Sequence, residues 1–250
     1  MRAQLRAELL KHRSTRTNLG LLATLLGLVL LAVLLHGLAL PAGELVGAED
    51  QLSIVVGWGA KLGVLFAGLL GAMSMTSEFR HGTIRPTFLV TPQRSRVVFA
   101  KALAGTSYGS AFGLLATAVA LGAGRIALGA RGIESRLDLH DQILFVAGGA
   151  VGAALWAAVG AGVGALVRNQ VPALVGLCAW LLLVEGLLLG DLFPAIGTVT
   201  RFAPGAAAAA MSGLEADELL APVGGFGVLV LYALVGTGLG AVATARRDVG

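Results

Sequence analysis

The nearest approach to a catalytic motif is a G-x-S-x-G pentapeptide with Ser107 at its centre. In hydrolases this pattern marks a serine nucleophile on a sharp turn between a strand and a helix. Here it lies inside a long apolar segment, and Gly105, Gly109 and Gly113 recur at every fourth residue. Small residues at that spacing share one helix face and let helices pack closely in lipid. We interpret these glycines as packing surface and keep an intramembrane serine enzyme using Ser107 as an alternative.

Cofactor and metal chemistry find little support elsewhere in the chain. The four histidines are scattered, and no two of them have metal-ligand spacing. The sequence contains no G-x-x-x-x-G-K-[ST] loop to hold nucleotide phosphates. We therefore expect no catalytic residue, no metal site and no directly bound cofactor.

Two ionisable residues, Lys61 and Glu185, lie inside otherwise apolar segments. An ionisable residue within a membrane indicates function by default. A lysine can also extend its long side chain to the membrane surface, and we favour this simpler role for Lys61. The side chain of Glu185 is shorter, so we predict for it either a place in a transport path or an interhelical hydrogen bond.

The most informative polar stretch is residues 77–96, SEFRHGTIRPTFLVTPQRSR. It is too polar to span a membrane, yet it carries apolar residues such as Phe88 and Leu89 among its charges. Exposed apolar groups of this kind mark a binding surface. Gly82, Pro86 and Pro92 predict turns that divide the stretch into short helical pieces.

The elements that position these residues follow from composition. Of the 250 residues, 56% are hydrophobic and 13% are charged, whereas a soluble domain has about 25% charged residues. This composition excludes a soluble globule and indicates a polytopic membrane protein. A helix needs about 20 apolar residues to cross a bilayer. Residues 1–250 are predicted to form a single all-α transmembrane domain with spans at 19–40, 54–76, 97–124, 143–167, 171–190 and 222–244.

An even number of spans places both termini on one side of the membrane. Most Lys and Arg residues fall in the segments that would share this side, which are 1–18, 77–101, 168–170 and 245–250. Because basic residues favour the cytoplasmic side, we predict cytoplasmic termini. The net charge of +4 then reflects topology, and no nucleic-acid partner is expected.

Two further segments lie outside the spans. Residues 1–18 alternate leucines with charges, which predicts an interfacial helix, although a plain basic flank would also fit. Residues 191–221 are semi-apolar and contain two prolines, which make a single helix improbable and predict a re-entrant segment before the last span. Within the fourth span, a row of glycines predicts close packing in the bundle or against a second protomer: Gly148, Gly152, Gly160 and Gly164.

Residues 78–101 resemble the signature of type 2 ABC exporter permeases. That signature has an acidic residue, a Gly-Thr pair, a Pro-x-Arg stretch and a basic residue that opens the third span. The matching residues here are Glu78, Gly82-Thr83, Pro92 with Arg94, and Lys101. The opening of the chain and the region from Glu185 through Pro194 to Gly205 are also similar, and the resemblance covers nearly the whole six-span layout.

The resemblance implies the membrane subunit of an export pump in the cell membrane. Such a pump pairs two permease chains, identical or paralogous, with two copies of a separate ABC ATPase that binds ATP and Mg. The segment after the second span would form the coupling element, with Phe88 and Leu89 filling a pocket of the ATPase. Arg94, Arg96 and Lys101 would anchor its return at the lipid headgroups. The coupling residues implied are Glu78, Phe79, Arg80, Gly82, Thr83, Arg85, Phe88, Leu89, Pro92, Arg94, Arg96 and Lys101. A membrane assembly factor without transport activity is the remaining alternative.

Overall fold

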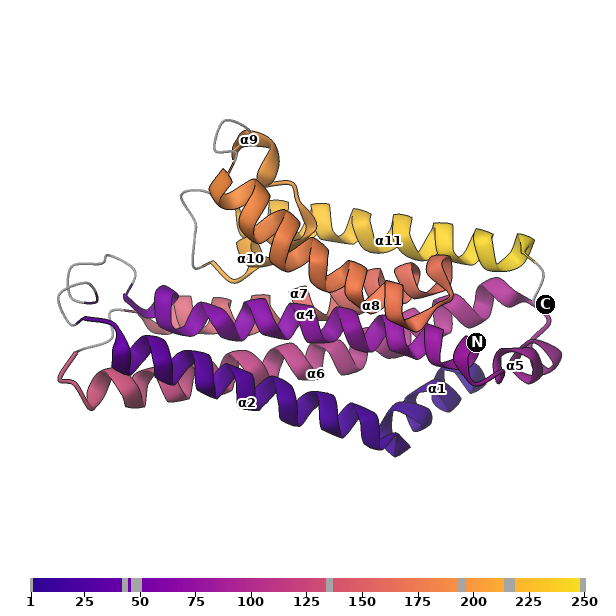
Figure 1. Cartoon of the computed structure of the whole chain (residues 1–250), viewed down its shortest axis with the longest axis horizontal. Helices are drawn as coiled ribbons and strands as arrows, with labels where there is room; N and C mark the ends of the chain where they lie inside the picture. Colours follow the sequence, from indigo (N-terminus) through magenta and orange to yellow (C-terminus); the bar gives the residue numbers. More distant parts are fainter. Residues whose placement is uncertain are drawn as a thin grey trace.

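The computed structural model describes residues 2–41, 45, 51–133, 137–192, 197–213 and 219–247. Within these ranges all regular secondary structure is helical, as predicted (Figure 1). The elements are α1 (Arg2–Ser14), α2 (Arg16–Ala39), α4 (Gln51–Arg80), α5 (Ile84–Val90), α6 (Arg94–Gly129), α7 (Leu139–Val167), α8 (Gln170–Ala179), the π-helix η1 (Trp180–Leu192), α9 (Gly197–Thr200), α10 (Pro204–Met211) and α11 (Pro222–Arg246).

Among the residues that the structure describes, six helical segments are long and apolar enough to cross a membrane, which confirms the predicted number and order of spans. They are Arg16–Ala39, Ile54–Arg80, Arg94–Gly129, Leu139–Val167, Gln170–Leu187 and Pro222–Arg246. Several run past the predicted ends, because helical hydrogen bonding continues beyond the last apolar residue. The connection between the second and third spans is therefore shorter than residues 77–96.

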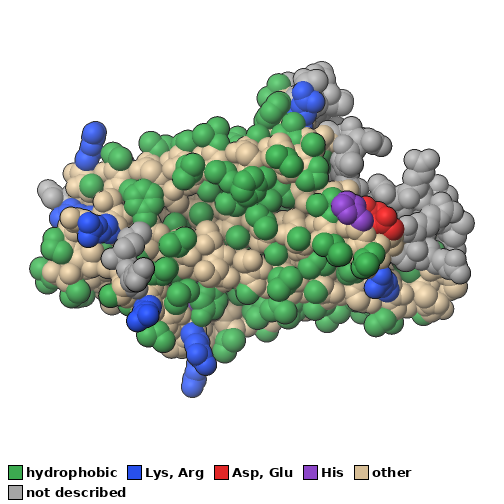
Figure 2. Space-filling view, turned by 180° about the vertical axis from the view of Figure 1, so that it is seen from behind, with side chains coloured by type: hydrophobic (Ala, Val, Ile, Leu, Met, Phe, Trp, Pro, Cys, Tyr) green, Lys and Arg blue, Asp and Glu red, His purple; other side chains and the backbone are tan. Residues whose placement is uncertain are grey.

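Three helices, α4, α6 and α7, form the centre of the bundle. In the apolar 18-residue stretch that could span the membrane, 67% of the residues are buried in α4 and 61% in α7. By contrast, only 17% of the residues in the corresponding stretch are buried in α2 and 11% in Gln170–Leu187, so these two spans lie at the periphery. Apolar side chains cover much of the long sides of the molecule, as Figure 2 shows for one face.

Glycines set the spacing between the central helices. A Cβ added to Gly109 of α6 would lie 2.7 Å from the Ala153 carbonyl oxygen of α7. One added to Gly164 of α7 would lie 2.7 Å from the Ala72 carbonyl oxygen of α4. Gly113, Gly148 and Gly160 are similarly enclosed by the backbones of Gly149, Met211 and Gly68. At Gly105 and Gly152 the nearest atoms are 3.8 Å and 3.6 Å away, which is ordinary contact.

Both chain ends lie at the end of the bundle that carries α1 and α5, whereas α9 and α10 lie toward the other end (Figure 1). We call the first the α5 end. It contains α1, α5, the start of α6 and the C-terminal turns of α4, α7 and α11. Within the predicted segment 191–221, α9 and α10 are short helices, while Pro194 lies outside the described residues.

Candidate functional site

The connection between α4 and α6 contains the short helix α5. Gly82 lies in this connection with a φ of +69°, a conformation that residues with a side chain rarely adopt. At the other end of α5, the Thr91 N–H donates to the Thr87 carbonyl oxygen at 2.9 Å, and Pro92 leads into α6. Gly82 and Pro92, two of the three residues expected at turns, therefore lie on either side of α5. The break expected at Pro86 is wrong, because Pro86 lies in the first turn of α5, where a helix tolerates proline.

Helix α5 presents different side chains to the bundle and to its surroundings. Ile84 is 2% exposed and packs with Met75 of α4 and Val98 of α6, and Phe88 is partly buried against the same cluster. Leu89 and Val90 are 84% and 85% exposed. The sequence-based hypothesis treated Phe88 and Leu89 as one outward-facing pair. The structure separates them, because Phe88 packs against the bundle while Leu89 is free to contact another molecule.

The arginines of this region have different surroundings. Arg80 donates to the Gln170 side chain at 3.3 Å, and Arg94 donates to the Arg247 carbonyl oxygen at 3.0 Å. The Arg94 guanidinium also lies 5.3 Å from the centre of the Phe88 ring. Arg85 and Arg96 are exposed.

Lys101 lies at the centre of a buried ion cluster. Its ammonium is 2.8 Å from Glu8 Oε2 of α1 and 2.8 Å from Glu78 Oε1 of α4, and it donates to the Ser74 carbonyl oxygen at 3.0 Å. Lys11 bridges the same two carboxylates at 2.8 Å and 2.7 Å. The side chain of Lys101 is 2% exposed and that of Lys11 is 50% exposed. The predicted headgroup contact of Lys101 is therefore wrong, because its charge is inside the protein.

The charges of this cluster balance. Two carboxylates face two ammonium groups, and the three N–H donors of Lys101 all have acceptors. Burial acts to raise the pKa of Glu8, but the charges and hydrogen bonds of Lys101 and Lys11 outweigh it and lower that pKa. For Lys11, burial acts to lower the pKa, but hydrogen bonds from Glu78 and Glu8 outweigh it and raise that pKa. The cluster ties α1, α4 and α6 together.

Further contacts hold α1 against α6. The His12 ring stacks on the Tyr108 ring with centroids 4.8 Å apart. The Tyr108 hydroxyl donates to the Leu9 carbonyl oxygen at 3.2 Å, and the Asn18 amide lies 3.0 Å from His12 Nδ1. Helix α1 is thus fixed on the bundle by polar contacts along its length.

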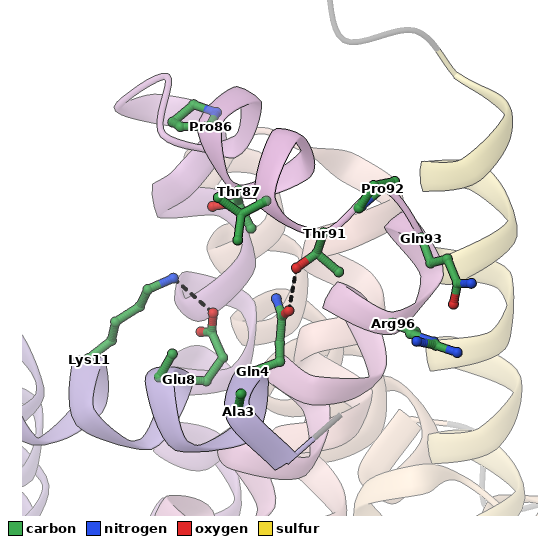
Figure 3. Close-up of a pocket in the computed structure, with 12 residues that line it drawn as sticks. Ala3, Gln4, Glu8, Lys11, Pro86, Thr87, Thr91, Pro92, Gln93 and Arg96 are labelled. Atoms are coloured by element: carbon green, nitrogen blue, oxygen red, sulfur yellow. Dashed lines mark hydrogen bonds and ion pairs between the residues drawn. The ribbon is translucent and has the colours of Figure 1, made fainter.

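An open groove of about 750 Å³ runs between α1 and the α5 turn. Figure 3 shows Gln4, Glu8 and Lys11 on its α1 side and Thr91 on the opposite side. The Thr91 hydroxyl donates to the Gln4 side-chain oxygen across the groove. The Thr87 hydroxyl donates to Glu78 at 3.3 Å and so connects α5 to the ion cluster.

Glu185 caps α10, which lies toward the end of the bundle opposite α5 (Figure 1). Its Oε2 accepts from the backbone N–H groups of Gly205 and Ala206, at 2.7 Å and 3.0 Å, in the first turn of α10. The Trp180 indole N–H donates to its other oxygen. The carboxylate therefore satisfies N–H groups that a helix N-terminus leaves open, which matches the interhelical hydrogen bond among the two predicted roles.

The other chemical candidates show simpler surroundings. The Ser107 hydroxyl donates to the Leu103 carbonyl oxygen of its own helix at 3.4 Å, and it has no His or carboxylate partner in the described part of the chain. Lys61 lies on the exposed face of α4. Across the described ranges no three His, Cys, Asp or Glu residues are grouped to hold a metal ion.

Sequence reasoning missed the ion cluster, although two signals could have found it. Glu8 is the one acidic residue in the basic segment 1–18, and Lys101 lies at the start of the predicted span 97–124. An acidic residue in a basic segment and a lysine in an apolar segment, both expected near the same membrane surface, indicate an ion pair.

A comparison of the chain with known protein families and with curated proteins finds no match.

Proposed function

We propose that this chain is the membrane-spanning permease subunit of an ATP-driven ABC exporter and that α5 couples it to a separate ATPase. The observation that carries the proposal is the pair Leu89 and Val90, 84% and 85% exposed on a short helix beyond the end of the bundle. Large apolar side chains presented in this way suit a pocket on a partner. The ATPase, which binds ATP and Mg, would supply that pocket.

The proposed orientation places the α5 end in the cytoplasm, where ATP is available. Blue Lys and Arg side chains gather toward this end in the face shown in Figure 2. Basic residues near span ends favour the cytoplasmic side. Both termini then lie in the cytoplasm, and α1 lies along the inner membrane surface.

The ion cluster gives α5 a rigid base. Glu78 stands two residues before the end of α4 and bonds both Lys101 of α6 and Thr87 of α5. A push on α5 would therefore reach α4 and α6 together. Because Glu8 is bonded to the same lysine, α1 would move with them.

The working unit in this proposal contains two permease chains, identical or paralogous, and two ATPase chains. The peripheral spans α2 and Gln170–Leu187, 17% and 11% buried, have apolar surface available for a second permease or for lipid. Substrate would pass between the two permeases. The type 2 resemblance is the basis for export as the direction.

The proposal is tested by reconstituting the chain with its proposed ABC ATPase partner. Changing Leu89 and Val90 together to Ser should abolish complex formation and permease-dependent ATP hydrolysis. The control changes Val199, which is 64% exposed on α9 toward the other end of the bundle, to Ser. Intact coupling in the double variant would refute the proposed role of α5.

A further inference from the structure

Three arginines from separate elements meet at the α5 end. Arg94 is the first residue of α6, Arg168 is the C-cap of α7, and Arg247 is the C-cap of α11. Arg94 donates to the Arg247 carbonyl oxygen at 3.0 Å, and Arg247 donates to the Leu166 carbonyl oxygen at 3.2 Å. Arg168 donates to the Ala243 carbonyl oxygen at 3.1 Å. We call these three residues the arginine cluster.

The arginine cluster carries positive charge without a carboxylate partner in the part of the chain that the structure describes. The four ion pairs formed by Glu8 and Glu78 involve only the two lysines. Burial lowers the pKa of Arg168, and repulsion by Arg247 and Arg94 lowers it further. An anion between these guanidinium groups would relieve that repulsion.

The hydrogen-bonding capacity of the cluster is largely unused. Each guanidinium has about five N–H donors, and the bonds described above place only one per arginine on a carbonyl oxygen. Arg168 Nε is buried and has no hydrogen-bond partner among the described residues. A buried donor of this kind indicates a missing acceptor.

Arg168 also has an unusual backbone. Its φ is +58°, and within the described ranges it is the only residue other than glycine with a positive φ. Helices commonly end with glycine in this conformation. The arginine side chain extends from there over the Phe79 ring, 5.3 Å from its centre. Arg168 is therefore held in a defined position although its backbone conformation is unfavourable for a residue with a side chain.

We propose that the arginine cluster binds the phosphate group of an anionic phospholipid in the membrane leaflet at the α5 end. Planar guanidinium groups recognise phosphate through paired N–H donors, and basic pockets between membrane helices bind acidic headgroups. Exposed valines on adjoining turns of α7, α8 and α11 offer contacts for acyl chains: Val167, Val171 and Val242 are 42%, 69% and 47% exposed. This site is independent of the proposed export function.

The test measures lipid binding to the purified full chain by native mass spectrometry. Phosphatidylglycerol and phosphatidylcholine are the two lipid probes, and inorganic phosphate is the free-anion probe. The variant changes Arg94, Arg168 and Arg247 to Gln. The control changes three exposed arginines of α1 and α2 to Gln and so removes the same charge: Arg6, Arg13 and Arg16.

We expect the wild-type chain to prefer phosphatidylglycerol and the cluster variant to bind it about 100-fold more weakly, because each basic residue near an acidic lipid surface is worth roughly five-fold. The control should lose less than about three-fold, because its three arginines are spread along α1 and the start of α2 and do not act together on one phosphate group. Equal losses in variant and control, or unchanged binding in the variant, would overturn the proposal. So would inorganic phosphate that binds as tightly as the lipid, since the site would then take a free anion.

A single change guards against misfolding of the triple variant. Arg247 is exposed at the end of α11, so Arg247→Gln leaves the α7 cap in place. It should weaken phosphatidylglycerol binding about five-fold with an unchanged melting temperature. Full lipid affinity in this variant would contradict the assignment of Arg247 to the site.

Discussion

Removing the charge of Lys101 tests whether the buried ion cluster holds the α5 end together. Lys101→Met deletes an ammonium that lies 2.8 Å from each of two carboxylates, while Lys11, 50% exposed, remains. Breaking a buried ion pair from one side costs about 3–5 kcal/mol, because a charge is left buried without its partner. At about 2–4 °C per kcal/mol for a chain of this size, the melting temperature should fall by about 6–20 °C. Thermal unfolding in detergent, followed by tryptophan fluorescence, measures it.

Lys11→Met is the matched control. Lys11 contacts the same carboxylates at nearly the same distances but is half exposed, so its loss should cost about 1 kcal/mol. Adding Glu8→Gln and Glu78→Gln to Lys101→Met should restore most of the stability, because a neutral replacement of a buried ionic group is close to neutral in free energy. Equal melting temperatures for the two lysine variants, or no recovery in the triple variant, would refute the reasoning.

Three further predictions concern other parts of the bundle. Burial acts to raise the pKa of Glu8, but its two lysine partners outweigh burial and hold that pKa below the ordinary value of 4.5. The stability that Glu8 contributes is therefore present above pH 4.5 and lost as pH falls through the lowered pKa, and Glu8→Gln should flatten the melting temperature profile in acid. Gly109→Ala should destabilise the chain by about 1–3 kcal/mol in thermal unfolding, whereas Gly105→Ala should change stability by less than about 0.5 kcal/mol; equal effects would contradict the packing account. Glu185→Ala removes the cap of α10 at a cost of about 1–2 kcal/mol and should speed tryptic cleavage at the exposed Arg201; an unchanged cleavage rate would contradict the cap.

The six spans could be predicted from sequence because apolar length alone determines which segments can cross a bilayer. The turns on either side of α5 were also predictable. Glycine readily adopts the positive φ that Gly82 has, and Pro92 has no backbone N–H to donate within a helix. Both signals are local. They depend on residue type and on close neighbours in the chain.

The ion cluster depends on tertiary packing and could not be read in the same way. Glu8 and Lys101 are separated by 93 positions, and only the packing of α1 against α6 brings them within 2.8 Å. The opposite orientations of Phe88 and Leu89 depend on the exact rotation of α5 on the bundle, which a seven-residue helix does not encode clearly. The sequence does not decide between the two roles of Glu185, because the contact between its carboxylate and α10 is also a tertiary contact.

Protection of a thiol at position 89 tests the central claim most directly. In a Cys178→Ser background the chain has no other cysteine, and Leu89→Cys places a single thiol on the exposed side of α5. We predict that a membrane-impermeant maleimide labels this thiol from the cytoplasmic side and that the bound ABC ATPase blocks the labelling. Val199→Cys, toward the other end of the bundle and labelled from the opposite side of the membrane, should show no such protection. Equal labelling of Leu89→Cys with and without the ATPase, in a complex shown to be intact, would contradict coupling through α5.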